Sequence, residues 1–112
     1  MAKVIITNTL KEEILAKFRS NSEKIFMHMK KLESQPRVGK PLGTIGGVLI
    51  KEIKYENFRF YFITDGHILK FGSPEELANL LIKFVKMSGK KDQQKTINAI
   101  KQIIRTMGFE GF

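Results

Sequence analysis

The sequence predicts an α+β fold in a single domain covering residues 1–112, with an N-terminal strand and helical hairpin, an antiparallel β-meander and C-terminal helices. A chain of 112 residues fits one domain that can bury its own core. Runs rich in β-branched and aromatic residues occupy the middle of the chain and predict strands. Apolar stripes at helical spacing on either side predict helices. The order of the strands in the sheet stays open.

The N-terminal third predicts a strand followed by two helices. Residues 2–7, "AKVIIT", are mostly apolar and β-branched, as in a strand, and Asn8 or Thr9 can cap the helix that follows. Ser20 with Glu23 three residues later repeats the helix-start pattern. We therefore expect helices over 10–19 and 22–34, packed as an antiparallel hairpin. Their apolar stripes are Leu10, Ile14, Leu15 and Phe18, and then Ile25, Phe26, Met29 and Leu32.

A stretch rich in Gly and Pro separates these helices from the meander. Two prolines and four glycines over 36–47 predict an irregular linker. Residues 48–55 and 58–64 predict two hairpin strands, and the Asp-Gly pair at 65–66 predicts a turn into a third strand over 67–71.

The C-terminal third predicts two further helices. Ser73, Pro74 and Glu76 form a helix-start pattern, and the leucines that follow favour a helix over 74–87, although "LLIKFVKM" also fits a strand. The last helix is expected from Asp92, with Gly108 as its stop. The predicted order is β-α-α-β-β-β-α-α, with helices covering one face of the sheet and the other face left free.

Charge indicates the class of partner. Twenty Lys and Arg against eleven Asp and Glu give a formal net charge of +9, which favours binding to a polyanion such as RNA or the ribosome, although a solvated basic surface is the alternative. The absence of cysteine excludes disulfides and thiolate metal sites. No segment has the length of a membrane span, so we expect a cytoplasmic protein with no membrane partner and no cofactor.

An arginine stands inside the most aromatic strand, "FRFYFIT". Period-two alternation directs Phe58, Phe60 and Phe62 to the core and places Arg59 on the opposite face with Glu52 and Lys54. Such a face can bind a phosphate backbone. A cross-strand pair between Glu52 and Arg59 is the structural alternative, and the sequence does not decide between them.

The C-terminal region carries a second group of cations, opposed only by Asp92. Two of them, Lys90 and Lys91, lie in a predicted loop suited to phosphate contact. The two histidines form no metal site, although His67 is a possible proton-transfer group. The basic residues of this region are Lys83, Lys86, Lys90, Lys91, Lys95, Lys101 and Arg105.

The motifs "GKPLGTIGGVLIKEIK" and "FRFYF", together with the element order and a basic stretch "FVKMSGKKDQQKTINAIK", resemble the RelE/ParE superfamily, in its RelE/HigB-like, phage-derived branch. These are small basic toxins of toxin–antitoxin pairs. The resemblance implies a RelE-like fold and a ribosome-dependent mRNA endoribonuclease that inhibits translation without a metal. It also implies mRNA, the ribosome and an acidic antitoxin protein as partners.

The resemblance also implies roles for particular residues. Arg59 corresponds to the strand arginine that stabilises the phosphate in the transition state, and Lys54 and Lys86 correspond to further catalytic cations. A lysine is then the expected general base. Lys51, Lys83, Lys90 and Lys91 are the expected RNA-binding residues. Two other functions remain open: a non-catalytic RNA- or ribosome-binding module, and a ParE-like toxin directed at gyrase.

Overall fold

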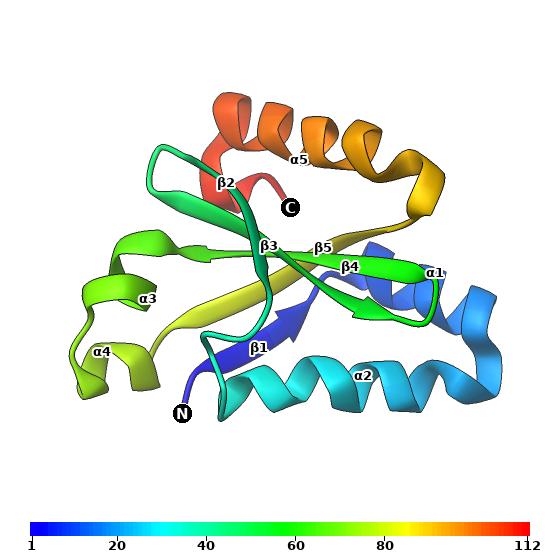
Figure 1. The fold of residues 1–112 in the computed structure, drawn as a ribbon, viewed down its shortest axis with the longest axis horizontal. Helices are drawn as coiled ribbons and strands as arrows, with labels where there is room; N and C mark the ends of the chain where they lie inside the picture. The colour runs from blue at the N-terminus through cyan, green and yellow to red at the C-terminus, as the bar shows by residue number, and fades with distance from the viewer.

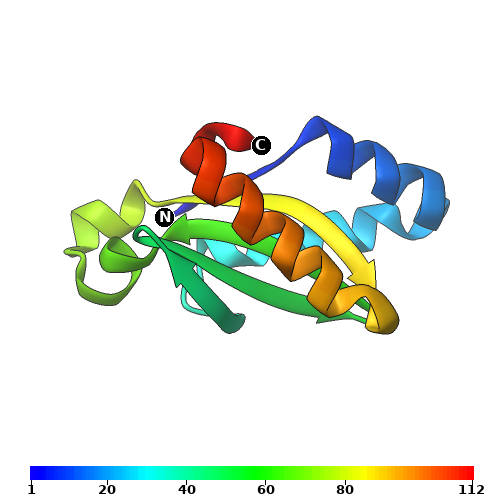
Figure 2. The ribbon, with the colours of Figure 1, turned by 90° about the horizontal axis from the view of Figure 1, so that it is seen from above.

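A five-stranded mixed sheet in the order β1-β5-β4-β3-β2 forms the centre of the molecule, described for residues 1–112 by a computed structural model. β1 is parallel to β5, and the other neighbours are antiparallel. Helices α1 and α2 lie on one side of the sheet and α5 on the other (Figures 1 and 2). The α+β class with an N-terminal strand, helical hairpin and C-terminal helix is confirmed, but the expectation of one free face is wrong.

The N-terminal strand and hairpin form where the sequence predicts them. β1 (Lys3–Ile6) leads into α1 (Asn8–Phe18), and a 3-10 turn (Arg19–Asn21) joins it to α2 (Ser22–Lys30), which continues into a second 3-10 turn (Lys31–Glu33). The cap of α1 is Thr7 rather than Asn8 or Thr9, because its hydroxyl accepts a hydrogen bond from the Leu10 amide at 3.3 Å.

The predicted linker contains an unpredicted strand. β2 (Lys40–Ile45) pairs with β3 (Val48–Tyr55), which pairs in turn with β4 (Phe58–Asp65). β2 tolerates Pro41 and Gly43 because it is an edge strand and its register shifts between these two residues. Gly46 and Gly47, both at positive φ, make the tight β2–β3 turn. Gly and Pro here mark an edge and a hairpin instead of an irregular segment.

The segment after β4 departs most from prediction. Residues 67–71 are not a third strand, because Asp65 caps a short helix, α3 (Gly66–Phe71), by accepting from the Ile68 amide at 3.0 Å. The capping box of Ser73 and Glu76 does start α4 (Pro74–Ala78), but that helix ends after five residues. The predicted helix over 74–87 is therefore wrong beyond residue 78.

Residues 81–89 form the strand that the sequence left as the alternative. β5 (Leu81–Gly89) lies between β1 and β4 and is covered on both faces. A strand buried on both faces has a nearly continuous apolar run, which imitates a helical stripe over a short window. The pairing of β5 with β4 also contains a bulge, so its register shifts between Tyr61 and Phe62.

The last helix is where the sequence predicts it. A 3-10 turn (Lys90–Asp92) leads into α5 (Gln93–Met107), which ends at Gly108 with φ 69° and a final 3-10 turn (Gly108–Gly111). Ile97, Ile100 and Ile104 are buried on the sheet. No helix of the structure is both long and apolar enough to cross a bilayer.

Two apolar cores result, one on each side of the sheet. The core under α1 and α2 is the larger and contains Phe60, Phe62 and Phe84, all without solvent exposure. The core under α5 is smaller and contains Ile50, Tyr61 and Ile63 from the sheet. We call these two sides the α1/α2 face and the α5 face.

Candidate phosphate-binding site

The strand register brings the predicted catalytic cations to the same end of the α5 face. Lys54 is paired with Arg59, which is paired with Ser88 on β5. Two residues further along each strand, and so on the same face, Glu52 is paired with Tyr61, and Tyr61 with Lys86. Residues directly opposite on neighbouring strands point to the same face. Arg59, Lys54 and Lys86, from three adjacent strands, therefore project from one surface.

Arg59 is held by a buried carboxylate. Its Nε lies 3.5 Å from Oε2 of Glu52, and the side chains are 11% and 3% exposed, respectively. The predicted face of Arg59 is correct, but its predicted accessibility is wrong, because most of the side chain is enclosed. The cross-strand pair with Glu52, considered above as the structural alternative, is present.

The same pair leaves Arg59 with unused donors. Its Nε is enclosed without a satisfactory hydrogen bond, and no protein acceptor takes a hydrogen bond from the guanidinium. The ion pair places the guanidinium beside Glu52, and its other donors keep capacity for a further anion, such as a phosphate. The two interpretations of Arg59, pairing and phosphate binding, are thus compatible.

The aromatic residues beside Arg59 behave largely as alternation predicts. Phe60 and Phe62 are fully buried on the α1/α2 face, and Phe58 is half-buried at its edge. The Phe58 ring meets Phe18 edge-on at 5.1 Å between centroids, and Lys17 Nζ lies 4.9 Å from the Phe58 centroid. These contacts fix β4 from the side opposite to Arg59.

Tyr61 and Ser88 form a polar contact beneath the cations that sequence reasoning missed. Their hydroxyl oxygens are 2.7 Å apart, and both residues are buried. Burial raises the pKa of the Tyr61 phenol, so the group stays protonated at neutral pH. The sequence pattern places Ser88 in a loop, and only the correct assignment of β5 reveals that it faces Arg59.

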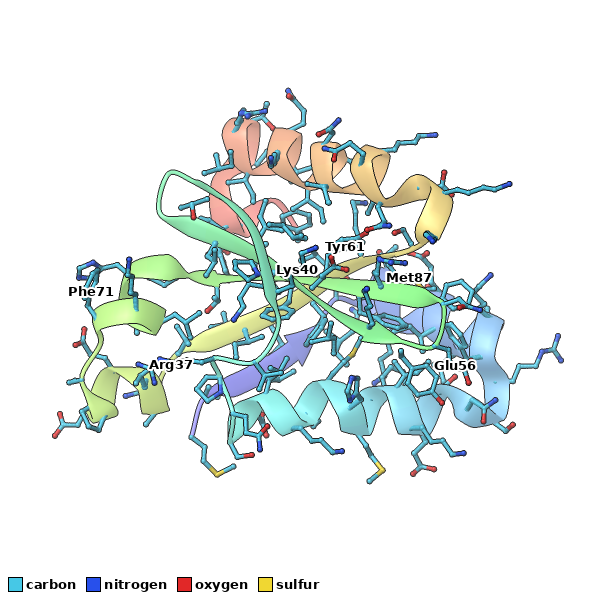
Figure 3. All side chains as sticks on the ribbon, viewed as in Figure 1. Arg37, Lys40, Glu56, Tyr61, Phe71 and Met87 are labelled. Atoms are coloured by element: carbon cyan, nitrogen blue, oxygen red, sulfur yellow. The ribbon has the colours of Figure 1, made fainter.

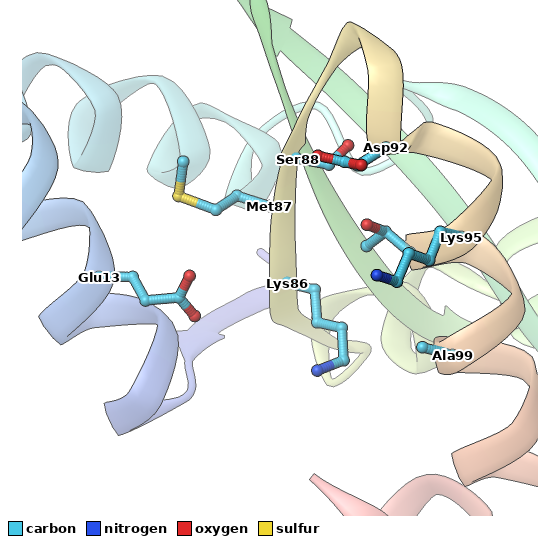
Figure 4. Close-up of a pocket in the computed structure, with 8 residues that line it drawn as sticks. Glu13, Lys86, Met87, Ser88, Asp92, Lys95 and Ala99 are labelled. Carbon is cyan, nitrogen blue, oxygen red and sulfur yellow. The ribbon is translucent and has the colours of Figure 1, made fainter.

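A cavity of about 340 Å³ opens beside Lys86, between β5 and the helices on either side (Figure 4). Lys86 from β5 and Lys95 from α5 extend along the same side of the strand, whereas Glu13 of α1 approaches from across it (Figure 4). Ser88 and Asp92 form the upper end. The cavity thus combines two amines, two carboxylates and the hydroxyls of Ser88 and Thr96 around the end of the cationic surface.

The remaining predicted RNA-binding lysines divide into two groups. Lys90 and Lys91 are exposed in the turn that follows β5, so they extend the site. Lys83 is half-buried, donates to the Phe112 carbonyl at 2.9 Å and lies 5.5 Å from the Phe109 centroid. Lys51 is buried on the α1/α2 face, opposite Phe62. The structure therefore does not bring Lys51 or Lys83 to Arg59.

The histidines also lie away from Arg59. His67 belongs to α3 instead of a strand beside β4, and the His28 ring contacts the Lys54 carbonyl at 3.2 Å from the α2 side. No group of three or more His, Asp or Glu side chains is arranged to hold a metal ion. No protein-family model, curated protein or solved structure matches this chain.

Proposed function

We propose that this protein is an RNA-directed toxin of the RelE type, a ribosome-dependent mRNA endoribonuclease that inhibits translation. The observation that carries the proposal is the convergence of Lys54, Arg59 and Lys86 at one end of the α5 face, with buried Glu52 holding the arginine. Clustered cations on a protein of net charge +9 suit a phosphodiester. The strand at 81–89 also brings the element order closer to the one that the resemblance implies.

In this proposal the RNA 2′-oxygen attacks the adjacent phosphorus. The new 2′-O–P bond forms while the P–O5′ bond breaks, leaving a 2′,3′-cyclic phosphate and a free 5′-hydroxyl. Arg59 donates to the phosphoryl oxygens as negative charge develops on them. Lys86 or Lys54 takes the 2′ proton as general base, and a protonated neighbour supplies the proton to O5′.

A non-catalytic RNA- or ribosome-binding module is the second candidate. One observation favours it. The phenol of Tyr61 faces the same side as Arg59, but it is enclosed and hydrogen-bonded to Ser88, so it does not reach an external substrate as a proton-transfer group would. Binding through Lys54, Arg59, Lys90 and Lys91 needs no such group, because phosphate contacts alone supply affinity.

We further propose an acidic protein as the antitoxin partner and the cytoplasm as the place of action. The support is electrostatic: a surface with this excess of cations attracts both RNA and an acidic protein segment. A bound antitoxin of this type would compete with RNA for the α5 face, and added antitoxin is expected to restore translation.

Translation of a reporter mRNA with purified protein and ribosomes tests the proposal. Ribosome binding is read by co-sedimentation and cleavage by primer extension. Arg59→Lys keeps a charge opposite Glu52 but removes the fork, so we expect cleavage to fall by about 10² or more while binding remains. Lys24→Ala, at an exposed α2 position, is the matched control. Binding without cleavage in the wild type selects the second candidate. If the wild type shows neither binding nor cleavage at low salt, both candidates are contradicted.

A further inference from the structure

A second cationic cavity lies on the α1/α2 face, away from Arg59. It has a volume of about 700 Å³ and is formed by the loop before β2, by β2 and β3, and by α3. Arg37, Lys51, Lys70 and His67 line it, and no carboxylate does. Figure 3 places two of its residues, Arg37 and Phe71, at the end of the molecule opposite to Glu56 and the β3–β4 turn.

Lys51 is the most unusual of these groups because it is a buried cation without a counter-ion. The residue is 4% exposed, and its Nζ donates to the Arg37 carbonyl at 2.9 Å. The two ion pairs of the molecule, Lys30–Glu33 and Arg59–Glu52, do not include it. A buried ammonium with one neutral acceptor is costly, and an anion in the cavity would compensate its charge.

The loop before β2, which contacts Lys51 through Arg37, is held in position by a close backbone approach. Gly39 has φ 112°, and a Cβ at this position would lie 2.9 Å from Cζ of Phe62. Only glycine allows the chain to cross this ring at such a distance. The crossing brings the Arg37 carbonyl to Lys51, so the amine is part of an ordered wall.

An aromatic surface forms the other wall of the cavity. Phe71 is 67% exposed, so most of its ring is accessible to a ligand. The His67 ring lies beside it at 5.3 Å between centroids, and Lys70 Nζ lies 5.4 Å from the Phe71 centroid. An accessible ring beside a lysine amine is an arrangement on which nucleic-acid bases stack.

We propose that this cavity binds a nucleoside phosphate, with the phosphate at Lys51 and Arg37 and the base on Phe71. The volume lies within the usual range for small-molecule sites. The ligand is either a free mononucleotide or a nucleotide of an RNA strand, since both offer the same phosphate and base. This site lies on the face opposite to Arg59 and does not depend on the proposed ribonuclease activity.

Titration of the ¹⁵N-labelled protein, followed by NMR at low salt, tests the site. The probes are AMP, adenosine, inorganic phosphate and a short oligoadenylate. We expect AMP to bind at least tenfold more tightly than adenosine or phosphate, with shifts at residues 37, 51 and 66–71. A ratio of oligoadenylate to AMP affinity well above one identifies an RNA strand as the natural source, and a ratio near one identifies a free nucleotide.

Variants separate the contributions of the two walls. Lys51→Met should lower AMP affinity at least tenfold, and Arg37→Ala, at an exposed position, gives the same direction without a risk to folding. Phe71→Ala should weaken AMP severalfold and leave phosphate binding unchanged. Lys24→Met is the control, and Arg59→Lys should leave AMP binding intact whether or not the protein cleaves RNA. Unchanged affinity in Arg37→Ala and Lys51→Met, or AMP no tighter than phosphate, overturns the proposal.

Discussion

The two faces of the sheet differ in how completely apolar side chains cover them. On the α1/α2 face, Phe60, Phe62 and Phe84 join two helices in one continuous core of 14 buried residues. On the α5 face the core has 7, and it stops where Glu52, Arg59 and Ser88 take over from Ile50 and Ile63. The single helix covers the middle of its face and leaves one end to charged groups. The fold thus buries more apolar residues on the α1/α2 face and leaves the end of the α5 face to the Arg59 site.

Removing a fully buried side chain from each face tests this division most strongly. Phe60→Ala should lower the free energy of unfolding by about 3–5 kcal/mol, because a fully buried ring is removed and leaves a cavity. Ile100→Ala on α5 is expected to cost less, since a smaller side chain is removed from a smaller core. Urea unfolding of both variants measures the difference. An equal or larger cost for Ile100→Ala would show that the two faces contribute alike.

The next effect concerns the charged pair that interrupts the α5 face. Glu52→Ala leaves Arg59 enclosed without its partner, so we expect a decrease of about 1–3 kcal/mol in the free energy of unfolding. Glu52→Ala combined with Arg59→Met removes both charges and should recover part of this decrease. The same denaturant titrations measure both proteins. If the double variant is no more stable than Glu52→Ala, the pair does not act as a unit.

A smaller effect depends on pH and belongs to the α1/α2 face. Burial lowers the pKa of the Lys51 ammonium from its ordinary value of 10.5. The unfolded chain therefore binds this proton more readily than the native protein. Below the lowered native pKa, the charged and buried amine decreases the free energy of unfolding by its full amount. As pH rises from that pKa to 10.5, this decrease disappears and the Lys51 contribution to stability increases.

Lys51→Met removes this titration and provides the comparison. At neutral pH the variant should match or exceed the wild type in stability, and its advantage should shrink as the pH approaches 10.5. The raised pKa of Tyr61 lowers the free energy of unfolding only as the pH rises above its ordinary value of 10.0, and it does so equally in both proteins. Urea unfolding at about pH 7, 9 and 10 gives the difference. Two parallel pH curves would mean that the amine is effectively solvated.

The sequence predicts the α1/α2 face better than the α5 face, and the reason is physical. Phe60 and the stripe that begins at Leu10 express the local rule of periodicity, whereas the predicted cap, Asn8 or Thr9, lies one or two residues after the observed cap, Thr7. β5 does not express this rule, because burial on both faces removes the alternation that identifies a strand. Because the sequence favoured a helix for this segment, the positions predicted for Lys86 and Ser88 were also wrong.

The residues of the Arg59 site were likewise predicted correctly only where local rules decide their position. Lys54 and Arg59 were grouped correctly, because two strands joined by a tight turn fix their own register. The cover provided by α5 and the depth of Arg59 depend on contacts between residues distant in sequence, which alternation alone does not encode. The nucleotide-scale cavity around Lys51 was missed for the same reason, since β3 and α3 meet there only in the folded chain.

The smallest expected change in stability comes from the exposed turn at the end of the α5 face. Lys90→Glu with Lys91→Glu should alter the free energy of unfolding by less than about 0.5 kcal/mol, since exposed turn lysines make few native interactions. The same change should lower RNA affinity clearly, because it removes two cations that can neutralise phosphates and adds repulsion. The slope of log affinity against log salt should become shallower by about 0.7 for each phosphate of a single-stranded RNA that is no longer neutralised.

A charge-matched variant and a salt series decide whether this effect is local. Lys24→Glu with Lys31→Glu, at exposed positions on α2 and in the turn that follows it, gives the same net charge and is the control. Fluorescence anisotropy with a labelled RNA over a range of salt concentrations measures both proteins. A similar decrease in affinity in the control would mean that RNA responds to total charge, and that the α5 face has no special part in binding.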